Sequence, residues 1–172
     1  VFCAHANVQF TGSVQREPVT EARKLRISKP VLSLNTEVSA AMIRATLAAM
    51  TGAAADTECV LQIVLGAAFA PSTTPKHLPD PNATWLDAVL GNVHSASSEQ
   101  RKAVREKADQ YSYDAVIRVG ITGKHGTTRL HNIVSALRTL ESAGVHIRTD
   151  KEQPEHLDNA SLPWRMPLRL SV

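Results

Sequence analysis

The segment YSYDAVIRVGITGKHGTTRLHNIVSALRTL, residues 111–140, predicts the fold of this protein. Residues 111–123 alternate between apolar and polar side chains, as a half-buried strand does. One face of this strand carries Tyr113, Ala115, Ile117, Val119 and Ile121. A helix-period pattern follows and ends near Gly144. Its apolar stripe is formed by Leu130, Ile133, Val134, Leu137 and Leu140. The segment therefore predicts a strand packed beneath an amphipathic helix.

The loop between this strand and this helix resembles a phosphate-binding loop, but it lacks two required positions. A loop of the GxxxxGK[ST] type would place its Gly-Lys pair at Gly123. Its first glycine would then fall on Arg118 and its magnesium-binding hydroxyl on His125. We therefore expect a strand-to-helix turn with Thr127 or Thr128 as the N-cap, and no binding of ATP.

A second strand–helix–strand unit precedes this one. The segment VLSLNTEV, residues 31–38, alternates as a strand does, and the apolar strand CVLQIVLG occupies residues 59–66. Between them, residues 39–51 have the apolar periodicity of a helix whose stripe includes Ile43 and Leu47. We expect both of these side chains to be buried against the sheet.

The fold class predicted by this order is α+β, with a short fourth strand at 144–150. Two β-α-β units separated by an insertion are typical of the ferredoxin-like split βαβ fold, a four-stranded antiparallel sheet with both helices on one face. The domain spans 29–150, preceded by a strand-like arm at 1–28 and followed by a tail at 151–172. Either terminus could add an edge strand.

The insertion at 71–110 is expected to be a loop followed by helices. Prolines are too frequent in residues 71–83 for regular structure, and a short helix is predicted after them. Residues 97–110 then form a helix in which Ser97 and Gln100 are spaced as a capping box. The charges of this helix are mixed and its apolar stripe is thin, which favours a solvated helix.

Composition permits many partners and points to a reducing compartment. The 172 residues carry a net charge of +3 with a pI near 9.1, and only two cysteines occur, Cys3 and Cys59. Two isolated cysteines give no disulfide framework. No apolar run approaches the ~20 residues of a membrane-spanning helix. Because the chain starts at Val1 and ends in a strand-like run, we expect it to be a piece of a longer protein.

The sequence contains no catalytic motif. The seven histidines are scattered without the spacing of a metal site, and neither cysteine has a neighbouring base. The serines lack the GxSxG context of a hydrolase nucleophile. We therefore expect no catalytic residue, no metal, no cofactor and no enzymatic activity in this chain.

The sheet face away from the helices is expected to be open and polar. Its candidate partner-contact residues are Arg118, Arg148, His146, Glu37 and Asn35. This face carries no aromatic residue, so it does not match the base-stacking platform of RNA-binding sheets. Arginine forks on such a face could instead bind carboxylates of a protein partner. Charge reversal at Arg118 and Arg148 is then expected to leave the fold intact.

Four segments of the sequence resemble those of a known family. These are KPVLSLNTEVSAAMIRATLAAM, ECVLQIVLGAAFAP, YDAVIRVGITG and LPWRMPLRLSV, in this order. Together they resemble the region that precedes the motor domain in actinobacterial type IV secretion and conjugative DNA-transfer ATPases, which are coupling-protein-like chains. The resemblance covers most of residues 19–172. It implies a membrane-associated parent protein, a position on the cytoplasmic side of the bacterial membrane and a P-loop domain after Val172.

Three functions follow as hypotheses. The first is a non-catalytic assembly or docking domain of such an ATPase, which contacts protein partners by self-association or with the secretion machinery. The second is a nucleic-acid-handling module with a basic surface and weak, electrostatic binding. The third is a small enzyme on a ferredoxin-like scaffold. Membrane contact by this fragment itself is not expected.

Overall fold

The computed structural model describes residues 17–51, 57–74, 78–91, 94–123 and 126–171. Five strands and five α-helices lie in this part of the chain, together with one 3-10 turn, η2. In chain order they are β1 (Glu21–Ile27), α1 (Ser39–Thr51), β2 (Cys59–Phe69), α2 (Trp85–Val89), α3 (Ser98–Ala108), β3 (Ser112–Ile121), α4 (Gly126–Leu137), η2 (Arg138–Leu140), β4 (Ile147–Glu152), α5 (Pro154–Asp158) and β5 (Leu168–Ser171).

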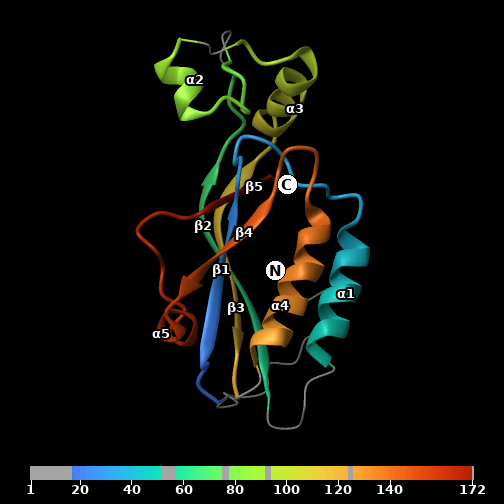
Figure 1. Cartoon of the computed structure of the whole chain (residues 1–172), viewed down its shortest axis with the longest axis vertical. Coiled ribbons are helices and arrows are strands. Elements are labelled where there is room, and N and C mark those ends of the chain that lie inside the picture. Colours follow the sequence, from blue (N-terminus) through green and yellow to red (C-terminus); the bar gives the residue numbers. More distant parts are fainter. Residues whose placement is uncertain (1–16, 52–56, 75–77, 92–93, 124–125, 172) are drawn as a thin grey trace.

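The strands form one antiparallel sheet in the order β2-β3-β1-β4. The strand β5 pairs with the first residues of β3, beyond the stretch of β3 that β1 occupies. Helices α1 and α4 lie side by side on one face of this sheet (Figure 1). The α+β class is confirmed, and the strand order is consistent with a ferredoxin-like arrangement. The C-terminal tail adds a strand, which the sequence analysis had allowed.

The β3–α4 segment builds the main core as predicted. Val119 and Ile121 of β3 are fully buried, and they pack against Ile133 and Leu137 of α4. Gly123 has a φ of 86° in the turn between strand and helix, a conformation that glycine adopts without strain. The N-cap prediction was wrong, because α4 begins at Gly126 and both threonines lie in its first turn.

The first strand among the described residues is β1, at Glu21–Ile27, and the prediction of a strand at 31–38 was wrong. The segment 31–38 contains no strand; in it, the side chain of Asn35 accepts a hydrogen bond from the backbone of Glu37, as in an Asx turn. The strand β1 contains four charged side chains among its seven residues, and these concealed it in the sequence. It lies between β3 and β4, so the residues assigned to an N-terminal arm are central. The predicted strand-like residues 1–16 lie outside the described residues.

Helix α1 forms where predicted but buries a different side. Ile43 and Leu47 are 52% and 54% exposed, so the expectation that they face the sheet was wrong. Met42 and Met50 pack against the core instead, with Thr46 buried between them. The reason is that α1 packs mainly on α4 and not on the strands. Its contact stripe is therefore set by the neighbouring helix.

The insertion folds as a small lobe at one end of the sheet, drawn at the top of Figure 1. Both helices of this lobe begin with a capping box, Thr84 with Asp87 in α2 and Ser97 with Gln100 in α3. The second capping box was predicted. The side chain of Asp80 accepts a hydrogen bond from Gln100 at 2.9 Å, which joins the loop to α3.

Candidate functional site

The predicted open face is partly closed. Leu157 of α5 is 1% exposed and packs with Val19 and Ala22 on the face away from α1 and α4. A Cβ atom at Gly120 would lie 2.7 Å from Leu157 Cδ1 and 2.9 Å from Val19 Cγ1. The glycine in β3 therefore allows α5 to approach the sheet closely. No helix was predicted from the sequence at the position of α5, and this face was therefore expected to be open.

Arg118 is buried beneath this cover and is not a surface residue. Its side chain is 1% exposed. The guanidinium donates hydrogen bonds to Gln62 Oε1 at 3.0 Å and to the carbonyl oxygen of Ser161 at 2.6 Å. Its Nε lies 3.6 Å from Glu152 Oε2. Arg118 thus joins β3, β2, β4 and the segment after α5 to one another.

Glu152 is the acidic centre of this buried cluster. Its carboxylate lies 3.1 Å from Lys24 Nζ and 2.7 Å from His156 Nδ1, and its side chain is 6% exposed. Burial raises the pKa of Glu152, but the hydrogen bonds from His156 and Lys24 outweigh it and lower the pKa to about 2. Glu152 is therefore ionised at neutral pH, and it is held by Lys24 of β1, by Arg118 of β3 and by the imidazole of His156 in α5. This arrangement is a structural ion-pair network that fixes α5 to the sheet.

The other four candidate residues do not join Arg118. Arg148 is exposed in β4, opposite Arg26 of β1. His146 is exposed and lies 3.0 Å from Glu141, and its hydrogen bond lowers the pKa of that carboxyl group. Asn35 and Glu37 belong to the turn before α1. The five residues therefore do not form one contact face.

The edge strand β2 presents an apolar surface instead. It spans 11 residues without a charged side chain, and it pairs only with β3 among the described residues. Ile63 and Leu65 are 55% and 59% exposed. A register shift between Leu65 and Ala68 interrupts the ladder with β3. The regular part of this uncovered edge is therefore Cys59–Leu65.

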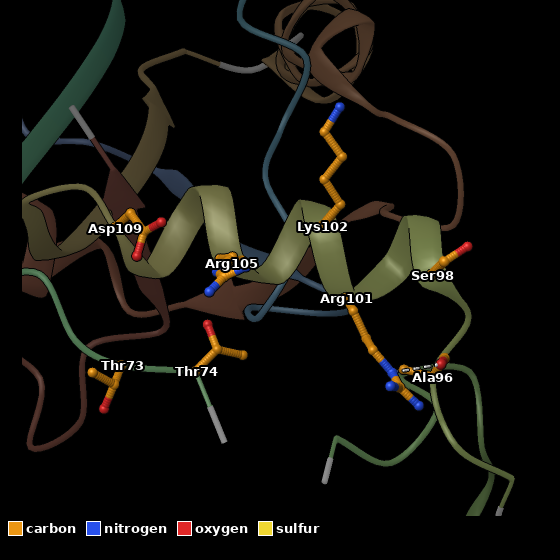
Figure 2. A pocket seen from close by; sticks show the side chains of 8 residues that line it. All are labelled: Thr73, Thr74, Ala96, Ser98, Arg101, Lys102, Arg105 and Asp109. Atoms are coloured by element: carbon orange, nitrogen blue, oxygen red, sulfur yellow. Dashed lines mark hydrogen bonds between the residues drawn. The ribbon is translucent and has the colours of Figure 1, made fainter. Parts of the chain in front are cut away.

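A second surface is a basic cleft in the insertion lobe, about 800 Å³ in volume and lined by α3 and two segments beside it. Figure 2 shows its lining residues: Thr73, Thr74, Ala96, Ser98, Arg101, Lys102, Arg105 and Asp109. The mixed charges of α3 had favoured a solvated helix, with no binding surface expected on it. The missed signal is the one-turn spacing of Arg101 and Arg105, which places both on the same side of the helix.

A neighbouring cleft of about 640 Å³ lies between α3, the loop at Pro30 and β5. Lys107 in its wall donates hydrogen bonds to the carbonyl oxygens of Pro30 and Leu32, at 2.6 and 2.8 Å. Burial, with a smaller effect from Arg169, lowers the pKa of Lys107 to about 8. Because its ammonium already donates hydrogen bonds to two carbonyl oxygens, we interpret Lys107 as a structural residue that links the lobe to the sheet domain.

Two further features concern the described residues alone. No three histidine, cysteine, aspartate or glutamate side chains come together there as a metal site would require. No helix in that part of the chain is long and apolar enough to cross a membrane. Lys124 and His125 of the glycine-rich loop lie outside it, so the expectation that ATP does not bind stays a prediction.

Comparison with models of protein families, with characterised proteins and with solved structures gave no match to this chain. The functional inference therefore depends on the geometry of β2 and of the insertion lobe.

Proposed function

We propose that this chain is a non-catalytic assembly domain that self-associates by pairing the edge of β2 with the β2 strand of a second copy. The observation that supports the proposal is the exposure of Ile63 and Leu65 on an edge strand with no charged residue. An uncovered apolar edge offers free backbone N–H and C=O groups for pairing with another strand.

A second copy fits this edge better than a charged partner would. Antiparallel pairing about a two-fold axis places the same strand opposite itself, so each side must tolerate its own residues. The segment Cys59–Leu65 contains no charge that would face a like charge across the axis. Apart from Gln62 at the centre, the side chains that would meet across the pairing segment are uncharged and apolar.

The exposed area predicts weak association. Full burial of an isoleucine or leucine stabilises by about 1.5–3 kcal/mol, so the four half-exposed side chains of a dimer would contribute roughly 3–6 kcal/mol. That sum is comparable to the low end of the association cost, about 4–15 kcal/mol. The net affinity then comes from the backbone hydrogen bonds across the edge, at about 0.5–1.5 kcal/mol each. A total of about 5.5 kcal/mol from several such bonds corresponds to a dissociation constant on the order of 0.1 mM, which is the value we expect.

A weak interface of this kind suits a domain that is held near its copies by a larger assembly. The sequence resembles the region preceding the motor domain of conjugative DNA-transfer ATPases, in which such a domain would help subunits dock beside the cytoplasmic face of the membrane. The proposal therefore includes an ATPase of this kind as the parent protein and the cytoplasmic face of the membrane as its location. The sequence resemblance supports both.

Sedimentation equilibrium over roughly 10 μM to 1 mM protein tests the proposal, because this range brackets the expected dissociation constant. The natural protein should shift from monomer to dimer. The double substitution Ile63→Lys with Leu65→Lys should remain monomeric, since lysines on an edge strand oppose pairing. The matched control, Leu162→Lys with Trp164→Lys, changes two residues that are 65% and 99% exposed outside β2, and it should still dimerise.

Two outcomes would contradict the proposal. One is a natural protein that stays monomeric at every concentration, and the other is a β2 variant that dimerises as well as the control. A truncation that lacks residues 1–16 identifies another occupant. If only the truncated protein dimerises, those residues cover the edge in the natural chain and a second copy does not.

A further inference from the structure

We propose that the cleft beside α3 is a binding site for a phosphate-bearing ligand, with Arg101 and Arg105 as its principal contacts. This site lies in the insertion lobe and is independent of the β2 edge. The cleft combines two arginines with three hydroxyl side chains, Thr73, Thr74 and Ser98. Guanidinium and hydroxyl donors are the groups that bind phosphate oxygens in proteins.

The two arginines are positioned by α3. Residues four apart on a helix lie about 5–6 Å from each other, measured between Cβ atoms. The Nε of Arg101 donates a hydrogen bond to the carbonyl oxygen of Ala96 at 3.0 Å, which orients its guanidinium at the cleft wall. Figure 2 shows Arg105 facing Thr74, while Lys102 extends from the other side of the helix. Arg101 and Arg105 can therefore contact one ligand together.

Both arginines lack a carboxylate partner among the described residues. By contrast, Lys102 on the same helix lies 3.8 Å from Glu106, and Arg26 in the sheet lies 3.2 Å from Asp150. The one carboxylate in the cleft lining is Asp109, which forms the C-cap of α3 at the far end. The excess of positive charge in the cleft favours an anionic ligand.

Thr74 gives an independent indication of a missing polar group. Its Oγ1 is buried and has no hydrogen-bond partner among the described residues. Buried polar atoms are nearly always satisfied, so an unpaired hydroxyl in a cleft wall calls for a ligand or water. Because this oxygen is shielded from solvent in the observed conformation, a phosphate bound to Arg105 would accept a hydrogen bond from it only after the Thr74 side chain rotates toward the cleft.

The size of the cleft indicates more than a free ion. A volume of about 800 Å³ lies in the range of sites for small organic ligands, roughly 300–1,000 Å³. The phosphate could belong to a small phosphorylated molecule or to the backbone of a single-stranded nucleic acid. The lining contains no aromatic residue, so bases would gain no stacking energy there. Strand binding would then be electrostatic and strongly dependent on salt.

Two probes distinguish these sources. Inorganic pyrophosphate is titrated by calorimetry, and a fluorescent single-stranded oligonucleotide is titrated by anisotropy at several salt concentrations. Replacing Arg101 and Arg105 by glutamine should weaken binding of the true ligand class by at least about tenfold, since charge-assisted hydrogen bonds to both residues are lost. For the oligonucleotide, the slope of log K against log salt should fall by about 1.4, the value for two phosphates.

The control variant carries Arg44→Gln and Arg165→Gln, which remove two exposed arginines outside the lobe. It has the same net charge as the test variant and should bind as the natural protein does. Thr74→Val removes only the unpaired hydroxyl and should weaken binding by a few-fold without a change in charge. Circular dichroism establishes that each variant is folded.

Binding of either probe that is lost with Arg101 and Arg105 but retained in the control supports the proposal, and the probe that binds identifies the source. Competition of pyrophosphate with the oligonucleotide would place both in the same cleft. The proposal is overturned if neither probe binds more tightly than about 1 mM at low salt. It is also overturned if the test and control variants lose affinity equally, because binding would then follow net charge alone.

Discussion

The strands β3 and β2 have similar apolar sequences and opposite environments. β3 includes an aspartate and an arginine, yet Ala115, Val116, Val119 and Ile121 are fully buried in it. β2 has no charged residue, yet much of it is exposed. The difference comes from position: β3 has strands on both sides, α4 on one face and α5 on the other, whereas β2 is an edge strand within the part of the chain that the structure describes. A strand that is apolar and uncovered indicates a surface that another chain can complete.

The largest effect is expected at Arg118 in β3. Arg118→Ala removes one member of a buried ion-pair network and leaves Glu152 partly uncompensated, which should lower the free energy of unfolding by about 3–5 kcal/mol. Urea denaturation measures this change. Arg148→Ala, on the exposed end of β4, is the control and should stay within about 0.5 kcal/mol. Similar costs for the two substitutions would contradict the burial of Arg118, and the earlier expectation of a harmless charge reversal would hold.

A slightly smaller loss is expected at Leu137, which covers β3 from α4. Leu137 is 4% exposed, so Leu137→Ala should cost about 2–5 kcal/mol of unfolding free energy through lost burial and a cavity. Leu47→Ala makes the same change on the exposed side of α1 and should cost less than about 1 kcal/mol. Thermal and urea unfolding of the pair would show whether α4, rather than α1, carries the helical core.

Lowering the pH should destabilise the protein through the ion-pair network on the face of β3 that α5 covers. The pKa of Glu152 is about 2 in the folded protein, below its ordinary value of 4.5. The stabilisation from this carboxylate is therefore complete above about pH 4.5 and is lost as the pH falls toward 2. Urea unfolding measured at pH 5 and at pH 3 should show a decline that is smaller in Glu152→Gln. An equal decline in both proteins would assign the acid sensitivity to other groups.

The smallest effect on stability is expected at the edge strand. Leu65→Ala should change the unfolding free energy of the monomer by less than about 1 kcal/mol, because Leu65 is 59% exposed. Dilute protein is used, so that association does not add to the measured stability. A loss as large as that at Leu137 would mean that β2 is covered within the monomer and would remove the contrast with β3.

The sequence predicted the parts of the fold that local patterns determine. The β3–α4 segment and the capping box of α3 formed as expected, since alternation, helical periodicity and Ser97–Gln100 spacing are all local. The strand β1 was missed because four charged side chains interrupt its apolar pattern. The burial of Arg118 depends on Ser161, which is 43 residues away. Such long-range contacts leave no periodic trace in one sequence.

The candidate site was harder to predict for the same reason. Alternation identifies a strand but does not distinguish an edge from a centre, so the exposure of Ile63 was not foreseen. The basic cleft needs Thr73 and Thr74 to fold back beside Arg105, across a proline-rich loop. The residues selected from the sequence were chosen for one open face, but α5 covers part of that face and the five residues do not lie together on it.

Hydrogen exchange at the backbone amides of Cys59–Leu65 tests the central claim most directly. The β2 amides that do not bond to β3 should exchange rapidly in dilute protein and become protected as the concentration rises toward about 1 mM, where the dimer forms. The amides of β3 should be protected at every concentration. Protection of the outer β2 amides that does not change with concentration, or their rapid exchange at all concentrations, would contradict pairing of this edge with a second copy.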